Sequence, residues 1–211
     1  MENLKLMTLK ELIGLLRKET DAKRIDEKRE EIARLMPKVR IMFDFDQKNQ
    51  AHQYDLWLHC IHTVTGLPRD LDDDMIYLGA LLHDIGKPDC QTRGRRADDE
   101  DMHYYGHPKR SMEIVRDEVI PGLLDQDGFE KEDARRLIYY VEHHDDRMSV
   151  DERCVNAYFD KGVSLEEFRN LMHLQVADAL AHVQIPIVAQ RVEKCRILSG
   201  AYACEVFRKR T

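Results

Sequence analysis

A histidine and an aspartate stand next to each other at the end of an apolar stretch of this sequence. The apolar residues 78–82 lead directly into His83 and Asp84, and the helix-stopping residues Gly86 and Pro88 follow. Imidazole and carboxylate groups are both good ligands for a divalent metal ion, and burying either without a partner costs free energy. The pattern predicts that the pair occupies the last turn of a largely buried helix, beside something electropositive.

A second aspartate stands where an apolar residue is expected. Leu171, Leu174, Asp178 and Ala181 follow one another at spacings of three, four and three residues, which places Asp178 on the apolar stripe of a helix. A carboxylate there is costly unless it is paired with a cation or bound to a metal ion. An arginine or lysine partner is the ordinary explanation, but the other possible metal ligands in the sequence make a metal ion the better one.

One further histidine can join this pair of acidic residues. His52, Leu56, His59 and Thr63 share one face of an expected helix, so His59 can point inward. A single histidine on such a face is more often a core or surface residue than a ligand. The interpretation therefore depends on a set of groups from three helices that can converge on one ion: His59, His83, Asp84 and Asp178.

Two other clusters are rich in histidine. Residues 103–108 contain His103 and His107, and residues 142–146 contain His143 and His144. Adjacent side chains project about 100° apart on a regular helix, so both members of the second pair can face one site only where the helix ends. Each cluster alone is more typical of an exposed polar segment than of a ligand pair.

Helices are the elements that must position these groups. Apolar residues recur at helical spacing along almost the whole sequence, which predicts helices there. We expect an all-α fold, because strand-like alternation is hard to find. The predicted helices cover residues 8–19, 25–36, 52–65, 72–85, 108–119, 131–144, 164–182 and 185–198. Ser164 and Glu167 form a capping-box pattern, and Pro108 and Pro186 suit a first helical turn. The longest irregular segment, 87–108, is polar and is expected to gate a site or hold a substrate.

Length and cysteine content point to one intracellular domain. The 211 residues suit a single domain, residues 1–211, with a core motif region at 43–182 and flanking helices at 1–42 and 183–211. The flanking helices are expected to complete the core, with a homodimer surface as the alternative. The five cysteines contain no C-x-x-C pair, so we expect reduced thiols rather than disulfides or a zinc knuckle.

Charge and hydropathy limit the kinds of binding partner that we expect for this protein. The net charge of −7 argues against a broad surface for duplex nucleic acid. Arg93, Arg95 and Arg96 form a local basic patch, but an acidic run at 98–101 follows, so nucleic acid is a disfavoured partner and only a local contact stays open. The sequence has no 18-residue apolar run and no apolar signal-peptide region, so we expect a cytoplasmic protein without a membrane partner.

In chain order, the candidate metal ligands form the series H…HD…H…HH…D: His59, His83-Asp84, His107, His143-His144 and Asp178. This series resembles that of the HD-domain metal-dependent phosphohydrolase superfamily. The resemblance spans roughly residues 43–182, and its most specific part is His-Asp-Ile-Gly-Lys-Pro after a small-apolar helix. Residues 45–59 and 103–107 are also similar to the HD region of bacterial tRNA nucleotidyltransferases. We expect this chain to lack the nucleotidyltransferase domain that normally precedes that region, and therefore to be a hydrolytic module that adds no nucleotides.

The resemblance implies a single-domain helical bundle of the HD-domain type and a set of metal ligands. One ion would be held by His59, His83, Asp84 and Asp178. A second ion would be held by His107, His143 and His144, with Asp84 as the bridging ligand. The cofactors implied are one or two divalent ions among manganese, iron, cobalt, nickel, magnesium and zinc. The stretch Gly-His-Pro-Lys-Arg-Ser around His107 departs from the commoner acidic residue after that histidine, which leaves the substrate contacts open.

The expected activity is hydrolysis of a small phosphorylated substrate, with a nucleotide or a cyclic phosphodiester as the leading candidates. A divalent ion makes hydroxide available near neutral pH, and a second ion stabilises charge on the phosphate oxygens. In this hypothesis Asp84 and Lys87 are the catalytic residues, and Lys87 also contacts a phosphoryl oxygen. His52, His103 and Arg110 are further substrate contacts. Lys87 could equally stabilise the negative end of its helix, and Arg110 could be a solvated helix residue.

Two alternatives belong to other classes. An HD-fold di-iron oxygenase would use the same ligands, and a non-catalytic metal- and nucleotide-binding regulatory module would bind without turnover. The Gly-Lys that follows the His-Asp pair favours hydrolysis, because it looks like an anion contact. The sequence contains no H-E-x-x-H segment, which excludes the metalloproteases that depend on it.

Overall fold

The computed structural model describes residues 6–96, 98–124 and 128–210, and the regular secondary structure of this part of the chain is almost entirely helical. The all-α prediction is confirmed, with one short hairpin added. The helices are α1 (Leu9–Lys18), α2 (Ala22–Asp26), α3 (Arg29–Leu35), α4 (Leu56–Gly66), α5 (Asp74–Leu82), α6 (Lys87–Cys90), α7 (His107–Ile114), α8 (Ile120–Leu123), α9 (Lys131–His143), α10 (Glu152–Phe159), α11 (Leu165–Leu180), α12 (Pro186–Ile197) and α13 (Ala203–Arg208). A 3-10 turn at Pro37–Met42 and two π-helical turns at Val115–Val119 and Leu198–Tyr202 continue or join them.

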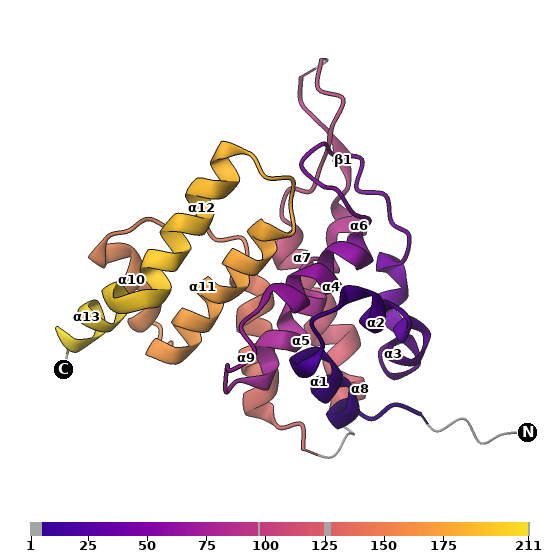
Figure 1. Ribbon diagram of the computed structural model, residues 1–211, viewed down its shortest axis with the longest axis horizontal. Helices are drawn as coiled ribbons and strands as arrows, with labels where there is room; N and C mark the ends of the chain where they lie inside the picture. The colour runs from indigo at the N-terminus through magenta and orange to yellow at the C-terminus, as the bar shows by residue number, and fades with distance from the viewer. Residues whose placement is uncertain (1–5, 97, 125–127, 211) are drawn as a thin grey trace, which may run out of the picture.

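The centre of the molecule is a group of four helices, α4, α5, α9 and α11, which pack against one another. Helices α1 to α3 lie on one side of this group, and α10, α12 and α13 lie on the other (Figure 1). Every residue of α5 from Met75 to Leu82 is buried, as expected for a helix that is apolar all round. The end of α5, and with it the His83-Asp84 pair, therefore lies inside the protein.

Helix starts follow the capping chemistry of the sequence. Ser164 and Glu167 form the expected capping box at the start of α11. Helix α4 begins later than predicted, because the carboxylate of Asp55 accepts a hydrogen bond from the backbone N–H of Leu58 at 2.8 Å and caps the helix there. His52 consequently lies in the loop before α4 and does not share a helical face with His59.

Other boundaries also differ from the prediction. The helix expected at 25–36 is broken into α2 and α3, and neither α10 nor α13 was predicted. The segment 87–108 is not a plain loop, since it contains α6 and the antiparallel strands β1 (Thr92–Arg93) and β2 (Met102–His103). This hairpin projects from one end of the molecule (Figure 1).

The turn after the His-Asp pair packs closely on α7. The backbone N–H of Gly86 donates to the hydroxyl of Ser111 at 2.9 Å. A Cβ atom at Gly86 would come within 2.4 Å of the backbone nitrogen of Ser111, so only glycine allows this approach. The contact fixes the start of α6 and therefore the position of Lys87.

None of the helices in the described ranges is both long and apolar enough to cross a lipid bilayer.

Candidate metal centre

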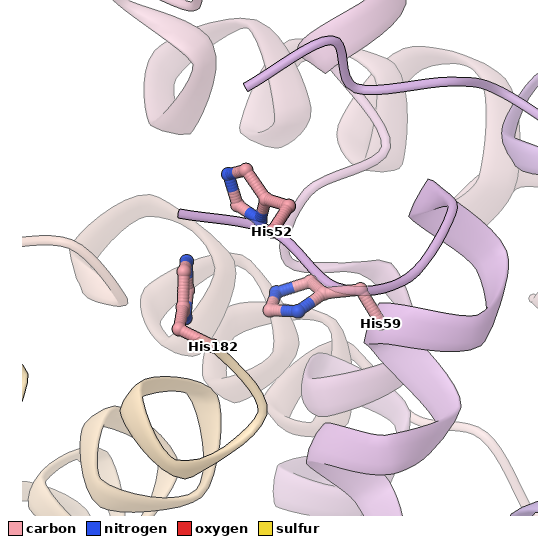
Figure 2. A group of neighbouring side chains, drawn as sticks. All are labelled: His52, His59 and His182. Carbon is pink, nitrogen blue, oxygen red and sulfur yellow. The ribbon is translucent and has the colours of Figure 1, made fainter. Parts of the chain in front are cut away.

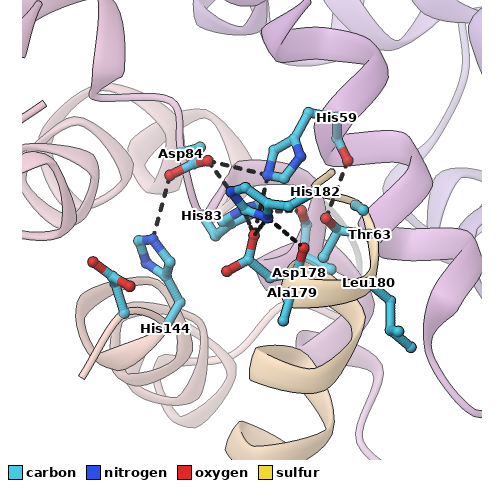
Figure 3. Close-up of polar contacts among 12 residues, drawn as sticks. His59, Thr63, His83, Asp84, His144, Asp178, Ala179, Leu180 and His182 are labelled. Atoms are coloured by element: carbon cyan, nitrogen blue, oxygen red, sulfur yellow. Dashed lines mark hydrogen bonds and ion pairs between the residues drawn. The ribbon is translucent and has the colours of Figure 1, made fainter. Parts of the chain in front are cut away.

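Four buried side chains from three helices meet at the end of α5. His59 Nε2 lies 3.3 Å from Asp84 Oδ2 and 3.1 Å from Asp178 Oδ1. His83 Nε2 lies 3.2 Å and 3.6 Å from the same two oxygens. Figure 3 shows these side chains directed toward one another from α4, from the end of α5 and from α11. We call His59, His83, Asp84 and Asp178 the first ligand group.

A second ligand group uses the other oxygen of Asp84. Oδ1 of Asp84 lies 3.1 Å from His107 Nε2 and 3.3 Å from His144 Nε2. The two imidazole nitrogens are 3.2 Å apart. Both ligand groups thus share Asp84. Its Oδ2 faces His59 and His83 of the first group, and its Oδ1 faces His107 and His144 of the second.

Backbone contacts fix the tautomer of three of the histidines. In His83, His107 and His144, Nδ1 lies close to a carbonyl oxygen of the preceding turn. The acceptors are Ala80 for His83 at 2.8 Å, Tyr104 for His107 at 2.8 Å and Val141 for His144 at 2.7 Å. A carbonyl oxygen only accepts, so each Nδ1 is the donor and, in the neutral ring, Nε2 carries the lone pair. A metal-binding histidine commonly has this arrangement.

Several buried polar atoms at this point have no hydrogen-bond partner. They are Nε2 of His59, Nε2 of His83, Oδ1 of Asp84 and Oδ1 of Asp178. Buried polar atoms are almost always hydrogen-bonded, so such a group of exceptions requires an explanation. Nitrogen and oxygen donors of this kind suit divalent transition metals, and the residues present therefore fit a bound cation.

The electrostatics of the pair of aspartates agree with this fit. Burial opposes ionisation of Asp84, but Lys87 and His83 outweigh it and hold its pKa well below the usual value. The pKa of Asp178 is likewise held low, because His182, His59 and His83 outweigh its burial. Both buried carboxylates therefore offer the anionic oxygen atoms that a divalent cation binds.

Asp84, Asp178, His107 and His144 of the ligand groups line an open pocket of about 340 Å³. Lys87 lies in its wall with its ammonium group 2.7 Å from Asp84 Oδ2 and 2.9 Å from Gln47 Oε1. The side chain of Lys87 is 5% exposed, so these two contacts hold the charge in one place. His52 and His103, two predicted substrate contacts, also line the pocket, although His103 Nε2 is bonded to Asp99 Oδ2 at 2.8 Å.

His52 and His59 form a third cluster with His182, and Figure 2 shows the three rings around a common space. Burial and the positive charge of Lys87 together lower the pKa of His52 to about 2, and both also lower the pKa of His182. This cluster contains no carboxylate to balance a cation. We therefore assign His52 and His182 to the pocket wall.

Two predicted site residues lie elsewhere. His143 belongs to none of the metal-binding groups found in the described part of the chain, because its Nδ1 faces Asp146 Oδ2 at 2.7 Å. It is the last residue of α9, and the following residue, His144, turns into the site instead. Arg110 does not line the pocket; it forms ion pairs with Asp89 at 2.7 Å and Glu113 at 3.5 Å. The structure brings the other predicted metal ligands together.

The pocket-lining residues that the sequence did not single out include His182 and Arg191. His182 lies four residues after Asp178 and its Nδ1 bonds the Asp178 carbonyl oxygen at 2.8 Å, so the helical spacing could have identified it. Arg191 reaches the pocket from α12, and no motif marks it.

Comparison with known proteins gives a family. The family model of the HD domain matches residues 51–184, which is more than half of the chain and includes both ligand groups. No curated protein matches the sequence. The similarity to the HD region of tRNA nucleotidyltransferases stays a prediction. The family match, however, is independent of the metal-site geometry and agrees with it. The chain belongs to the HD domain family.

Proposed function

We propose that this protein is a metal-dependent phosphohydrolase with two divalent ions at its centre. The first ligand group, His59, His83, Asp84 and Asp178, would hold one ion. Asp84, His107 and His144 would hold the other. The observation that carries the proposal is the position of Asp84, whose two oxygens face two separate sets of imidazole nitrogens. A carboxylate shared in this way would keep two ions close enough together to contact a single phosphate group.

Bound divalent ions would lower the pKa of water and stabilise negative charge on phosphate oxygens. The protein itself supplies orientation and charge. Asp84 and Asp178 stay ionised despite their burial, and the fixed tautomers of the second-group histidines keep Nε2 directed at the pocket floor. These groups need little rearrangement when a substrate enters.

Lys87 is proposed to bind a phosphoryl oxygen. Its ammonium group is held beside Asp84 and Gln47, and Lys87 is one of the residues that line the pocket, so the charge lies close to the space that a substrate would occupy. A fixed positive charge in a partly dehydrated wall stabilises the charge that develops on phosphorus-bound oxygens. His52, His103 and His182 would contact the remainder of the substrate.

The pocket favours a small substrate. Its volume of about 340 Å³ lies at the lower end of the range for ligand sites, and polar side chains dominate the wall. A nucleotide or a cyclic phosphodiester is the substrate class that we propose.

The test is to purify the protein and measure its bound metal, and then to assay a phosphomonoester and a phosphodiester with added manganese, cobalt, nickel or magnesium. Asp84→Ala should lose both metal and hydrolysis, whereas Lys109→Ala, a change on the outer face of α7, should retain both. Metal and activity that persist in Asp84→Ala contradict the proposal. Iron binding with oxygen consumption and no hydrolysis would support the oxygenase alternative.

A further inference from the structure

Arg191 contacts a residue of each ligand group, although it lies outside the segment that matches the HD domain family. It lies on α12, beyond the HD match at 51–184, and its side chain reaches the pocket. One nitrogen, Nη1, lies 3.4 Å from Asp178 Oδ2 and 3.1 Å from Asp145 Oδ1. The other, Nη2, donates to the carbonyl oxygen of His144 at 2.9 Å.

The contact with Asp178 leaves its ligand oxygen available. Oδ1 of Asp178 faces His59 and His83, whereas Arg191 approaches Oδ2. The guanidinium group therefore does not compete for the oxygen that would bind a metal ion. Instead it gives the second oxygen a charged partner, which fixes the rotation of the carboxylate.

The contact with His144 acts on the second ligand group. His144 stands where α9 has ended, so its backbone is not held by a continuing helix. Arg191 binds its carbonyl oxygen, while Nδ1 of the same histidine donates to Val141. Backbone and ring are thus fixed together, with Nε2 facing Asp84.

Helix α12 is itself anchored to the core. It packs along α11, and Val192 and Cys195 are buried in that contact. The thiol of Cys195 donates to Gln175 Oε1 at 3.3 Å, and the amide of Gln175 in turn donates to the carbonyl oxygen of His143 at 3.1 Å. Arg191 therefore projects from a rigid support.

We propose that Arg191 is a positioning residue that holds Asp178 of the first ligand group and His144 of the second in their metal-binding orientations. This inference rests on the proposed metal-dependent function. Groups that orient metal ligands typically contribute roughly 10- to 100-fold to metal affinity. An arginine suits the task because its planar fork reaches several acceptors at once, whereas a lysine presents one point charge.

The experiment measures the dissociation constant for Co²⁺ by equilibrium dialysis and records the visible absorption of the bound ion. Arg191→Ala should weaken Co²⁺ binding by roughly 10- to 100-fold and alter the absorption spectrum, and Arg191→Lys should fall between it and the wild type. Arg196→Ala, an exposed arginine of the same helix, is the matched control and should bind as the wild type does.

Thermal unfolding of the metal-free proteins separates positioning from general stability. A lower metal affinity at a similar metal-free melting temperature supports the inference. A wild-type dissociation constant in Arg191→Ala overturns it, and so does a lower melting temperature with unchanged affinity. Should Arg191→Ala fail to fold, Arg191→Lys decides by the same two criteria. If the wild type binds no more Co²⁺ than Asp84→Asn, the proposed function fails, and the inference about Arg191 fails with it.

Discussion

Asp84 and His107 come from the ends of different helices and meet with 3.1 Å between Oδ1 and Nε2. The opposite oxygen of Asp84 faces His59 and His83 and contacts Lys87. The carboxylate therefore separates two ligand groups that otherwise have no residue in common. This arrangement means that one group can be removed by mutation while the other is left in place.

Replacement of His107 tests this separation. In His107→Ala the second group loses a ligand, whereas the first group keeps all four of its side chains. We expect the purified variant to bind one equivalent of metal where the wild type binds two, with a large loss of hydrolysis. Elemental analysis after dialysis provides the count. Loss of both ions, or retention of both, would show that the two groups are not independent in this way.

The adjacent histidines at the end of α9 are predicted to differ sharply. His144→Gln should lose the second ion, because His144 Nε2 faces Asp84 Oδ1. His143→Gln should keep both ions and most of the activity, since His143 instead contacts Asp146. The expected cost of His143→Gln is about 1 kcal/mol of stability from the lost hydrogen bond. Metal content and activity of the two variants, measured side by side, check this prediction; a larger metal loss in His143→Gln would contradict it.

Lys87 is predicted to act on the reaction more than on folding. Lys87→Gln removes a positive charge from the pocket wall, and we expect kcat/KM to fall by roughly 100-fold. Lys109→Gln, on the outer face of α7, is the matched control. Steady-state kinetics with the metal-loaded proteins provides the comparison. Equal kinetics in Lys87→Gln and the control would exclude a contact between Lys87 and the phosphoryl group.

Glu167 is predicted to stabilise the helix that carries Asp178. Burial opposes its ionisation, but the backbone N–H of Ser164 and the guanidinium of Arg135 lower its pKa below the ordinary 4.5. Glu167→Gln keeps the capping geometry and removes the charge, which should cost about 1 kcal/mol at pH 7.

A lowered folded-state pKa means that this stabilisation is complete above the unfolded-state pKa and is lost as the pH falls through the folded-state value. The difference between wild type and Glu167→Gln should therefore shrink as the pH drops below 4.5. Denaturant unfolding at pH 7 and at successively lower pH tests the sign. A difference that grows on acidification would contradict the assignment.

Much of the site could be predicted because its residues break the pattern of their surroundings. Polar side chains that can bind a metal stand within apolar helical segments at His83, Asp84 and Asp178. Their burial in the structure follows directly from that position. The capping box of Ser164 and Glu167 was equally visible, since it depends on residues close in sequence.

The errors arose where the type and spacing of the residues do not decide the outcome. Periodicity predicted a helix that starts at His52, but Asp55 caps α4 and the helix begins only at Leu56. His143 and His144 could not be distinguished by type, because the last turn of α9 determines which ring enters the site. Arg191 was missed for a related reason: its role depends on how α12 packs, and no local pattern encodes that packing.

The most direct test of the account is a crystal structure of the protein grown with Mn²⁺, with an anomalous difference map recorded at a wavelength where manganese scatters anomalously. We predict two peaks that share Asp84, one among His59, His83 and Asp178 and the other beside His107 and His144. A map with no peak at either ligand group, or with Asp84 turned away from the bound ion, would contradict it.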